Sequence, residues 1–205
     1  MTELEFEQKY LLDQRQTNEI DRILKSRSDL KVVGIRQFYN GSENRYRSKY
    51  DFETRQDTVT KEKKTKIKID APYTVSLEDD PEPVSLDEFN RKFDASKRRL
   101  TKIRYIVNGT PIGHKVMVDF FLRPDKRVLM EPDNCYAIMA EVETVLDGDT
   151  KTLYLDLALP IYLEPFLLKM IDSRDSSAKD FKSANMTEDR IGDLEQALAK
   201  LYGST

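Results

Sequence analysis

The segment ELEFEQKYLL, from Glu3 to Leu12, alternates between apolar and polar side chains more strictly than any other part of the chain. Leu4, Phe6, Tyr10 and Leu12 fall on one face of an extended chain, and Glu5, Glu7 and Lys9 fall on the other. The alternation predicts a β-strand with one buried face. Whether the charged face meets water or lines a cavity depends on the other strands.

Six further segments have the alternation or β-branched and aromatic content of strands, and three have helical spacing. The predicted strands are KVVGIRQFYN, RYRSKYDF, TVTKEKKTKIKI, KRRLTKIRYIV, GHKVMVDFFL and CYAIMAEVET. Asn40-Gly41 suits a hairpin turn between the first two of these. Helices are expected around Ile20 to Leu24, after a Ser85 cap, and in a C-terminal helical segment within 160–203. The pattern predicts one α+β domain over residues 1–205, rich in antiparallel hairpins.

The overall charge excludes several function classes. The chain has 34 basic and 37 acidic side chains, and its net charge of -3 argues against a general nucleic-acid or membrane-surface binder. One cysteine, Cys135, cannot form an intramolecular disulfide, and the single histidine, His114, leaves no zinc site. No secretory signal is expected, because the first residues are acidic and lack a basic segment followed by an apolar one, and the longest apolar stretches are far shorter than the roughly 20 residues of a membrane span. A cytoplasmic protein is expected.

Charges at alternating positions are sorted by strand, apart from Lys9 beside Glu5 and Glu7. The acidic set is Glu5, Glu7, Asp119, Glu141 and Glu143, and the basic set is Arg45, Arg47, Lys61, Lys63, Lys102 and Arg104. A solvated sheet face gains little from like charges along a strand, since they repel. If the sheet closes into a barrel with these faces inward, acidic strands form one wall and basic strands another.

A lumen of this kind needs a highly charged ligand to neutralise it. Clustered Arg and Lys side chains suit several phosphate groups. Carboxylates without His or Cys nearby offer only oxygen ligands, which favours Mg²⁺ or Mn²⁺. The residues therefore predict a polyphosphate held together with a divalent cation, with the cations stabilising charge on the phosphoryl oxygens.

These motifs resemble the CYTH or triphosphate tunnel metalloenzyme superfamily. EFEQK matches the Glu-x-Glu-x-Lys signature of that family on the first strand. The segments RYR, KIRY, VDFF and AEVE follow in the family's order, and the match covers roughly residues 3–145. The resemblance implies an antiparallel, about eight-stranded β-barrel tunnel with flanking helices, which binds a triphosphate and one or two divalent cations.

The resemblance also implies roles for individual residues. Metal ligands would be Glu5, Glu7, Asp119, Glu141 and Glu143. Phosphate ligands would be Lys9, Arg45, Arg47, Lys102 and Arg104, joined by Lys61 or Lys63, and the catalytic group would be Glu5, Glu7, Lys9 and Asp119. Members of the family hydrolyse inorganic triphosphate, thiamine triphosphate, nucleoside triphosphates or RNA 5′-triphosphate ends, and some cyclise ATP.

The chain departs from the family pattern at two places. KIKID stands where many members carry an acidic pair, and Met117 stands where a Glu often precedes the Asp by two residues. The expected function is metal-dependent hydrolysis of a triphosphate-containing small molecule. Two alternatives stay open, an adenylate cyclase of the same fold and a polyphosphate- or nucleotide-binding module with little catalysis. No nucleic-acid partner is expected other than an RNA 5′-triphosphate end. The oligomeric state stays open, with a homodimer as one alternative.

Overall fold

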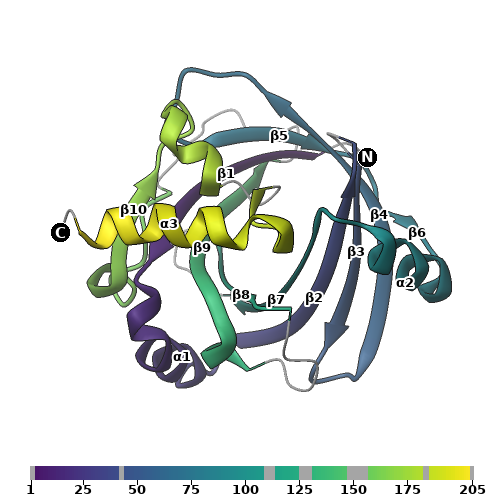
Figure 1. The fold of residues 1–205 in the computed structure, drawn as a ribbon, viewed down its shortest axis with the longest axis horizontal. Coiled ribbons are helices and arrows are strands. Elements are labelled where there is room, and N and C mark those ends of the chain that lie inside the picture. The colour runs from purple at the N-terminus through teal and green to yellow at the C-terminus, as the bar shows by residue number, and fades with distance from the viewer. Residues whose placement is uncertain are drawn as a thin grey trace.

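The chain folds around a closed antiparallel barrel. The computed structural model describes residues 3–41, 44–108, 114–124, 131–146, 157–181 and 185–203. Within these residues eight strands pair in a ring, and the expected α+β barrel is confirmed (Figure 1). In order around the ring they are β1 (Glu3–Leu12), β5 (Thr74–Glu78), β4 (Gln56–Ile67), β3 (Asn44–Asp51), β2 (Leu30–Asn40), β7 (Arg99–Val107), β8 (Lys115–Leu122) and β9 (Cys135–Leu146). The ring closes because β9 also pairs with β1.

Two further strands and three α-helices lie outside this ring. The strand β6 (Glu82–Pro83) pairs with β4, and β10 (Leu167–Ile171) pairs with β1. The helices are α1 (Thr17–Lys25), α2 (Leu86–Ala95) and α3 (Ile191–Tyr202), and short 3-10 turns are η1 (Gln14–Gln16), η2 (Pro132–Asn134), η3 (Glu164–Phe166), η4 (Ser176–Phe181) and η6 (Glu188–Arg190). None of the helices in the described ranges combines the length and the apolar character that a bilayer-spanning helix needs.

The first hairpin and the second helix form where the sequence predicts them. Gly41 has φ of +77° at the end of β2, a backbone conformation that glycine adopts without strain. The Ser85 side chain accepts a hydrogen bond from the backbone N–H of Glu88 at 3.2 Å and caps α2. The helix then packs Phe89 against Phe38 on the outer face of the barrel.

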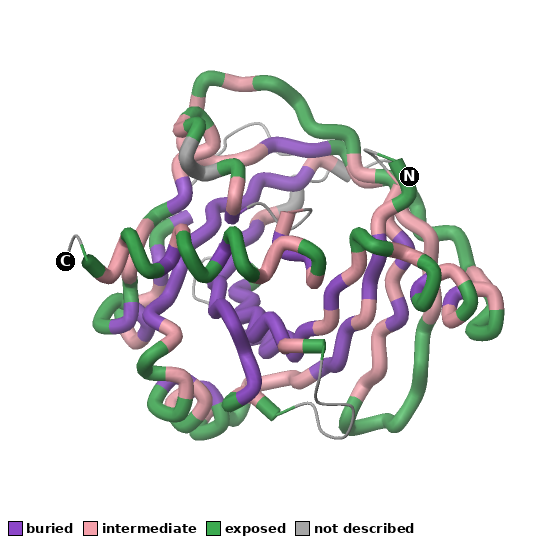
Figure 2. Tube along the Cα trace, in the orientation of Figure 1, coloured by how far each residue is buried: buried purple, intermediate pink, exposed green. Residues whose placement is uncertain are grey.

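The main apolar core lies outside the barrel wall. The apolar face of β1 contributes Phe6, Tyr10 and Leu12 to a cluster with β7, β8, β9 and the buried side of α1. Most barrel strands carry buried and intermediate residues, whereas β4 is largely exposed, as are the connecting segments and outer helix faces (Figure 2). Because side chains alternate along a strand, the polar face of β1 is left facing the lumen. The charged face of ELEFEQKYLL therefore lines a cavity.

One end of the lumen is filled by apolar side chains. The inward-facing rows that carry Lys9, Lys102 and Glu141 continue by two residues to Leu11, Leu100 and Met139. These three pack in one cluster with Phe121, Phe181, Met186 and the α3 residues Leu194 and Leu198. The helix lies across this end of the barrel (Figure 1). The charged part of the lumen is consequently sealed from solvent on the α3 side.

Candidate functional site

A cavity of about 160 Å³ occupies the charged part of the lumen. Eight of its lining side chains are cationic and five are carboxylates, so positive charge is in excess. The lining comprises Glu5, Glu7, Lys9, Gln37, Tyr39, Arg45, Arg47, Lys64, Lys66, Glu78, Lys102, Arg104, Lys115, Glu141 and Glu143.

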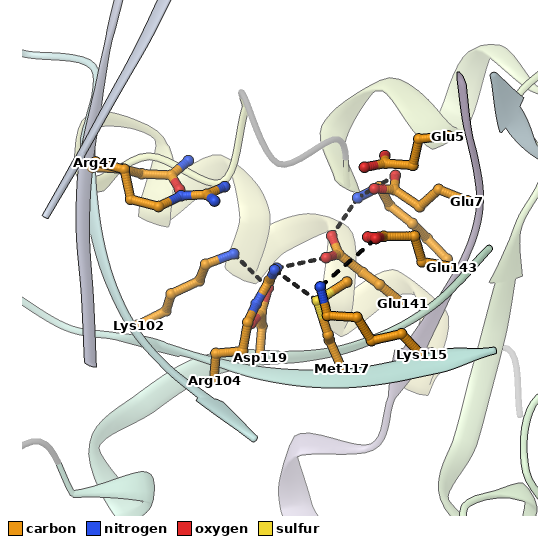
Figure 3. Close-up of polar contacts among 12 residues, drawn as sticks. Glu5, Glu7, Arg47, Lys102, Arg104, Lys115, Met117, Asp119, Glu141 and Glu143 are labelled. Carbon is orange, nitrogen blue, oxygen red and sulfur yellow. Dashed lines mark hydrogen bonds and ion pairs between the residues drawn. The ribbon is translucent and has the colours of Figure 1, made fainter. Parts of the chain in front are cut away.

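Three carboxylates form an acidic cluster on one side of the cavity. Oxygen atoms of Glu5, Glu7 and Glu143 lie within 4.8 Å of one another. Strand pairing explains this, since Glu7 of β1 lies directly opposite Glu143 of β9, and Glu5 is two residues earlier on the same face. Figure 3 shows these three on the side of the cavity opposite Arg47 and Lys102. A set of carboxylate oxygens alone fits a hard divalent cation.

The members of the acidic cluster differ in their affinity for protons. Burial raises the pKa of Glu5 to about 7, with Lys64 opposing the shift and Glu143 adding to it. Burial also raises the pKa of Glu143. Although burial acts in the same sense on Glu7, Lys64 and Lys9 lower its pKa to about 2. Burial therefore disfavours the charged form of Glu5 and Glu143, whereas Lys64 and Lys9 keep Glu7 ionised.

Glu141 takes part in internal ion pairs instead of joining the acidic cluster. One of its carboxylate oxygens contacts the Lys9 ammonium, and the other accepts a hydrogen bond from Arg104 Nη2 at 2.6 Å. Lys9 Nζ also lies 2.7 Å from Glu7 Oε1. Despite its burial, Lys9 and Arg104 hold the pKa of Glu141 well below its usual range. The predicted metal ligand Glu141 is therefore placed as a brace between two cations that line the cavity.

Asp119, predicted as a metal ligand and catalytic residue, lies behind the basic wall. Its side chain is fully buried and is absent from the cavity lining. Arg104 donates to both of its oxygens at 2.6 Å, and Lys102 Nζ lies 2.5 Å from one of them. Met117, two residues earlier on the same face, accepts from Arg104 Nη1 through its sulfur at 2.9 Å (Figure 3). Asp119 is thus a counter-ion that orients two cations.

The opposite wall presents guanidinium groups from β3. Arg45 Nε donates to Glu62 at 2.9 Å. Arg47 Nη1 lies 3.5 Å from the same carboxylate, while Arg47 Nε is buried and has no hydrogen-bond partner in the described part of the protein. Burial and the neighbouring Arg45 lower the pKa of the Arg47 guanidinium. The guanidinium lines the cavity, and its ion pair with Glu62 leaves Nε without an acceptor among the described residues.

Lys102 is the ammonium group on this wall with the weakest hold on its proton. Burial and the adjacent Arg104 lower its pKa to about 7, although Asp119 opposes the shift. The surrounding cations Arg104 and Arg47 act in the same direction. An anionic ligand beside Lys102 would restore its full charge.

The prediction of Lys61 or Lys63 as phosphate ligands placed them in the lumen, and the structure places them on the other face of β4. Lys61 Nζ pairs with Glu82 of β6 at 2.8 Å, outside the barrel. Neither lysine lines the cavity, whereas Lys64 and Lys66 do. The register decides the face, because Arg45 pairs directly with Glu62 and so fixes the even positions of β4 inward.

Sequence reasoning missed several lining residues for the same reason. In a strand with lysines at both parities, only the β3–β4 register shows which lysines face the lumen. The pairing of β4 with β5 places Glu78 directly opposite Lys64, so Glu78 also faces the lumen. Lys115 stands four residues before Asp119 on the same strand, so a count of alternate positions would have identified it. Gln37 and Tyr39 face inward because they lie directly opposite Arg47 and Arg45 across the first hairpin.

Comparison with known proteins gives weak structural likenesses. No protein-family model matches the chain, and no curated protein matches its sequence. A chain in the Schizosaccharomyces pombe Mediator head module aligns with a TM-score of 0.49 and 10% identity, over 73% of this chain and 86% of that one. The PH1819 protein from Pyrococcus horikoshii OT3 aligns with a TM-score of 0.45 and 16% identity, over 71% of this chain and 80% of that one.

An enzyme is also among the similar structures. The S. pombe RNA triphosphatase Pct1, solved in complex with the Spt5 CTD, aligns with a TM-score of 0.35 and 11% identity, over 69% of each chain. Likenesses at this level say nothing about ligand or reaction. The case for function depends on the geometry of the cavity.

Proposed function

We propose that the barrel binds a triphosphate-containing small molecule and hydrolyses it with the help of a divalent cation, as the CYTH-type motifs imply. The observation that carries the proposal is the division of the cavity into a cationic wall with an unsatisfied Arg47 Nε and an acidic cluster facing it. A polyphosphate together with a metal ion complements both surfaces. Either component alone would leave one surface unneutralised.

The basic wall supplies the binding energy for phosphate. Eight cationic side chains and five carboxylates line the cavity, and Asp119 and Glu62 behind the lining pair with four of the cations, so a smaller excess of positive charge is left for an anion. Arg47 and Arg45 provide forked donors suited to phosphate oxygens. Lys102 and Arg104 are fixed by Asp119, so they need no reorientation when the ligand arrives. We infer that the triphosphate lies between β3 and β7 with its charge toward these groups.

The acidic cluster fits Mg²⁺ or Mn²⁺, with Glu5, Glu7 and Glu143 as the ligands. When bound, such an ion neutralises charge on phosphoryl oxygens and activates water. Lys9 stands beside this cluster, held by Glu7 and Glu141, and its ammonium can contact a phosphate oxygen next to the cation site. Phosphoryl transfer makes few covalent demands on a protein, so rigid placement of these charges is the main contribution that the chain makes.

Two features support the second candidate, a module that binds a polyphosphate with little turnover. Met117 offers a thioether where a further carboxylate would add a cation ligand. Glu141 and Asp119 direct their oxygens to Lys9, Lys102 and Arg104. Fewer carboxylates are then left for cations than the sequence suggested. A cyclase of the same fold would use the same cavity and differ in its product.

The test is release of phosphate and pyrophosphate from inorganic triphosphate, ATP, GTP, thiamine triphosphate and a 5′-triphosphate RNA, with Mg²⁺, Mn²⁺ or EDTA. We expect metal-dependent release that is lost in Glu5→Gln and retained in Glu19→Gln, a control on the exposed face of α1. Pyrophosphate with a cyclic nucleotide would indicate the cyclase. Thermal stabilisation by these compounds without release would favour the binding module, and no stabilisation and no release would overturn both.

A further inference from the structure

A lysine occupies the position in the acidic cluster where a cation would bind. The Lys64 ammonium contacts a carboxylate oxygen of Glu5 and lies 3.1 Å from Glu78 and 3.5 Å from Glu7. Two of these three carboxylates also belong to the acidic cluster. The side chain of Lys64 is 16% exposed, so little water separates it from them.

The position of Lys64 follows from the pairing of three neighbouring strands. Lys64 of β4 lies directly opposite Glu78 of β5, and Ser76 of β5 lies directly opposite Glu5 of β1. A lysine side chain is long enough to pass over the small Ser76 and reach the carboxylates on β1. The contact therefore joins regular strands, and its geometry does not depend on a loop.

We propose that Lys64 is a tethered cation that competes with the divalent metal for Glu5 and Glu7 and moves to the phosphates when the ligand binds. This inference rests on the proposed function, because it assigns a role to Lys64 in loading the same site. The ammonium of Lys64 is a positioning group in this account: it controls when the acidic cluster accepts the metal.

Charge and space make the two cations mutually exclusive. A divalent ion binds carboxylate oxygens at roughly 2.0–2.2 Å, which places it within a few ångströms of an ammonium on the same oxygens. Two cations at that separation repel strongly in a cavity with little water. The four-carbon stem of Lys64 allows its ammonium to move, unlike the braced groups Lys102 and Arg104.

The cavity offers Lys64 a second place to bind. Arg45 Nη2 lies 3.5 Å from Glu78, the carboxylate that Lys64 also contacts, so this edge of the acidic cluster borders the basic wall. A triphosphate on the basic wall brings oxygens within reach of the Lys64 ammonium. Its departure frees Glu5 and Glu7 for the metal. Triphosphate and metal should therefore bind with positive coupling, and each should tighten the other by the same factor.

The experiment is calorimetric titration of Mn²⁺ at pH 8 into the wild type, Lys64→Met and Lys61→Met, with and without a non-hydrolysable triphosphate analogue. Lys61→Met is the matched control, a lysine of the same strand that pairs with Glu82 outside the barrel. We expect the analogue to tighten Mn²⁺ binding to the wild type about 10-fold, within the usual range of such coupling. Lys64→Met should bind Mn²⁺ about 10-fold tighter than the wild type without the analogue, and its coupling should be smaller than that of the wild type, because only the direct attraction between metal and phosphate remains.

Equal or weaker Mn²⁺ binding by Lys64→Met, with coupling unchanged, would overturn the proposal. If that variant fails to fold, Lys64→Gln replaces it, and the wild-type titration alone stays decisive, since absence of coupling there also overturns the proposal. The result is separable from the proposed function. If the wild type hydrolyses triphosphate but Lys64→Met binds Mn²⁺ as the wild type does, only the inference about Lys64 is wrong. If the titrations come out as predicted but no substrate is hydrolysed, only the proposed hydrolysis is wrong.

Discussion

Lys9 of β1 and Glu141 of β9 lie directly opposite each other, and their side chains form a buried ion pair inside the barrel. The second oxygen of Glu141 accepts from Arg104, so one carboxylate joins β1, β7 and β9. Glu143, two residues further along the same face, has a looser partner, with Lys115 Nζ 3.8 Å away. Two inward-facing glutamates of one strand therefore have different roles, the first in holding the wall together and the second in the acidic cluster.

This difference predicts opposite phenotypes for the two glutamates. Glu141→Gln leaves Lys9 and Arg104 short of a buried partner, and we expect the free energy of unfolding to fall by about 3–5 kcal/mol. Glu143→Gln removes a carboxylate whose pKa is raised by burial, so stability should stay nearly unchanged while Mn²⁺ affinity falls. Urea denaturation and calorimetric titration of both variants check this. Equal loss of stability in the two would contradict the assignment.

The basic wall makes a prediction about Arg47. Arg47→Met removes a guanidinium with an unsatisfied Nε, and loss of its charged hydrogen bonds, about 1.5–3 kcal/mol, should weaken triphosphate binding roughly 10- to 100-fold. Stability should change little, because burial and the neighbouring cations Arg45 and Arg104 offset the attraction of Glu62 for this group. The matched control is Arg36→Met, an arginine over the Phe89 ring on the outer face of β2. Equal loss of affinity in both variants would refute a specific role for Arg47.

Much of this arrangement could be predicted from the sequence, and the limits have physical causes. The alternation of Glu5, Glu7 and Lys9 fixes a one-sided strand, and sorted charges point to a closed lumen because an open sheet gains nothing from them. The faces of β4 could not be assigned, since Lys61, Lys63, Lys64 and Lys66 occupy both parities and only pairing with β3 separates them.

The sequence also could not show which cation each buried carboxylate would pair with. Asp119 and Glu143 are both inward-facing acids on neighbouring strands, and nothing in their spacing distinguishes a counter-ion from a cation ligand. The distinction arises in three dimensions: Asp119 lies directly opposite Arg104 and engages it through both oxygens, while Glu143 lies opposite Glu7. Pairwise registers across three strands are needed to see it.

Metal binding should depend on pH through Glu5. Its pKa of about 7 means that a proton competes with the cation below neutrality. Mn²⁺ affinity should rise as the pH increases from 6 to 8, with proton release on binding at the lower pH. Titrations in buffers of different ionisation enthalpy measure both quantities, and Glu5→Gln should lack the rise. An affinity that is flat from pH 6 to 8 in the wild type would contradict the assignment.

Acid stability should depend on Glu62, which neutralises the β3 arginines. Although burial opposes ionisation, Arg47 and Arg45 lower its pKa to about 2 from an ordinary value of 4.5. A lowered folded-state pKa gives stability that is complete above 4.5 and is lost as the pH falls toward 2. Thermal unfolding should show Glu62→Gln less stable than the wild type at pH 7, with the two converging near pH 2. A constant difference across this range would argue against the ion pair.

The central claim is tested most directly by ³¹P NMR of inorganic triphosphate incubated with the protein and Mg²⁺, beside samples with EDTA and with Glu5→Gln. We predict that the triphosphate signals are replaced by orthophosphate and pyrophosphate in the first sample only. Triphosphate signals that stay unchanged in intensity, position and width in all three samples would show neither turnover nor binding, and would contradict the account.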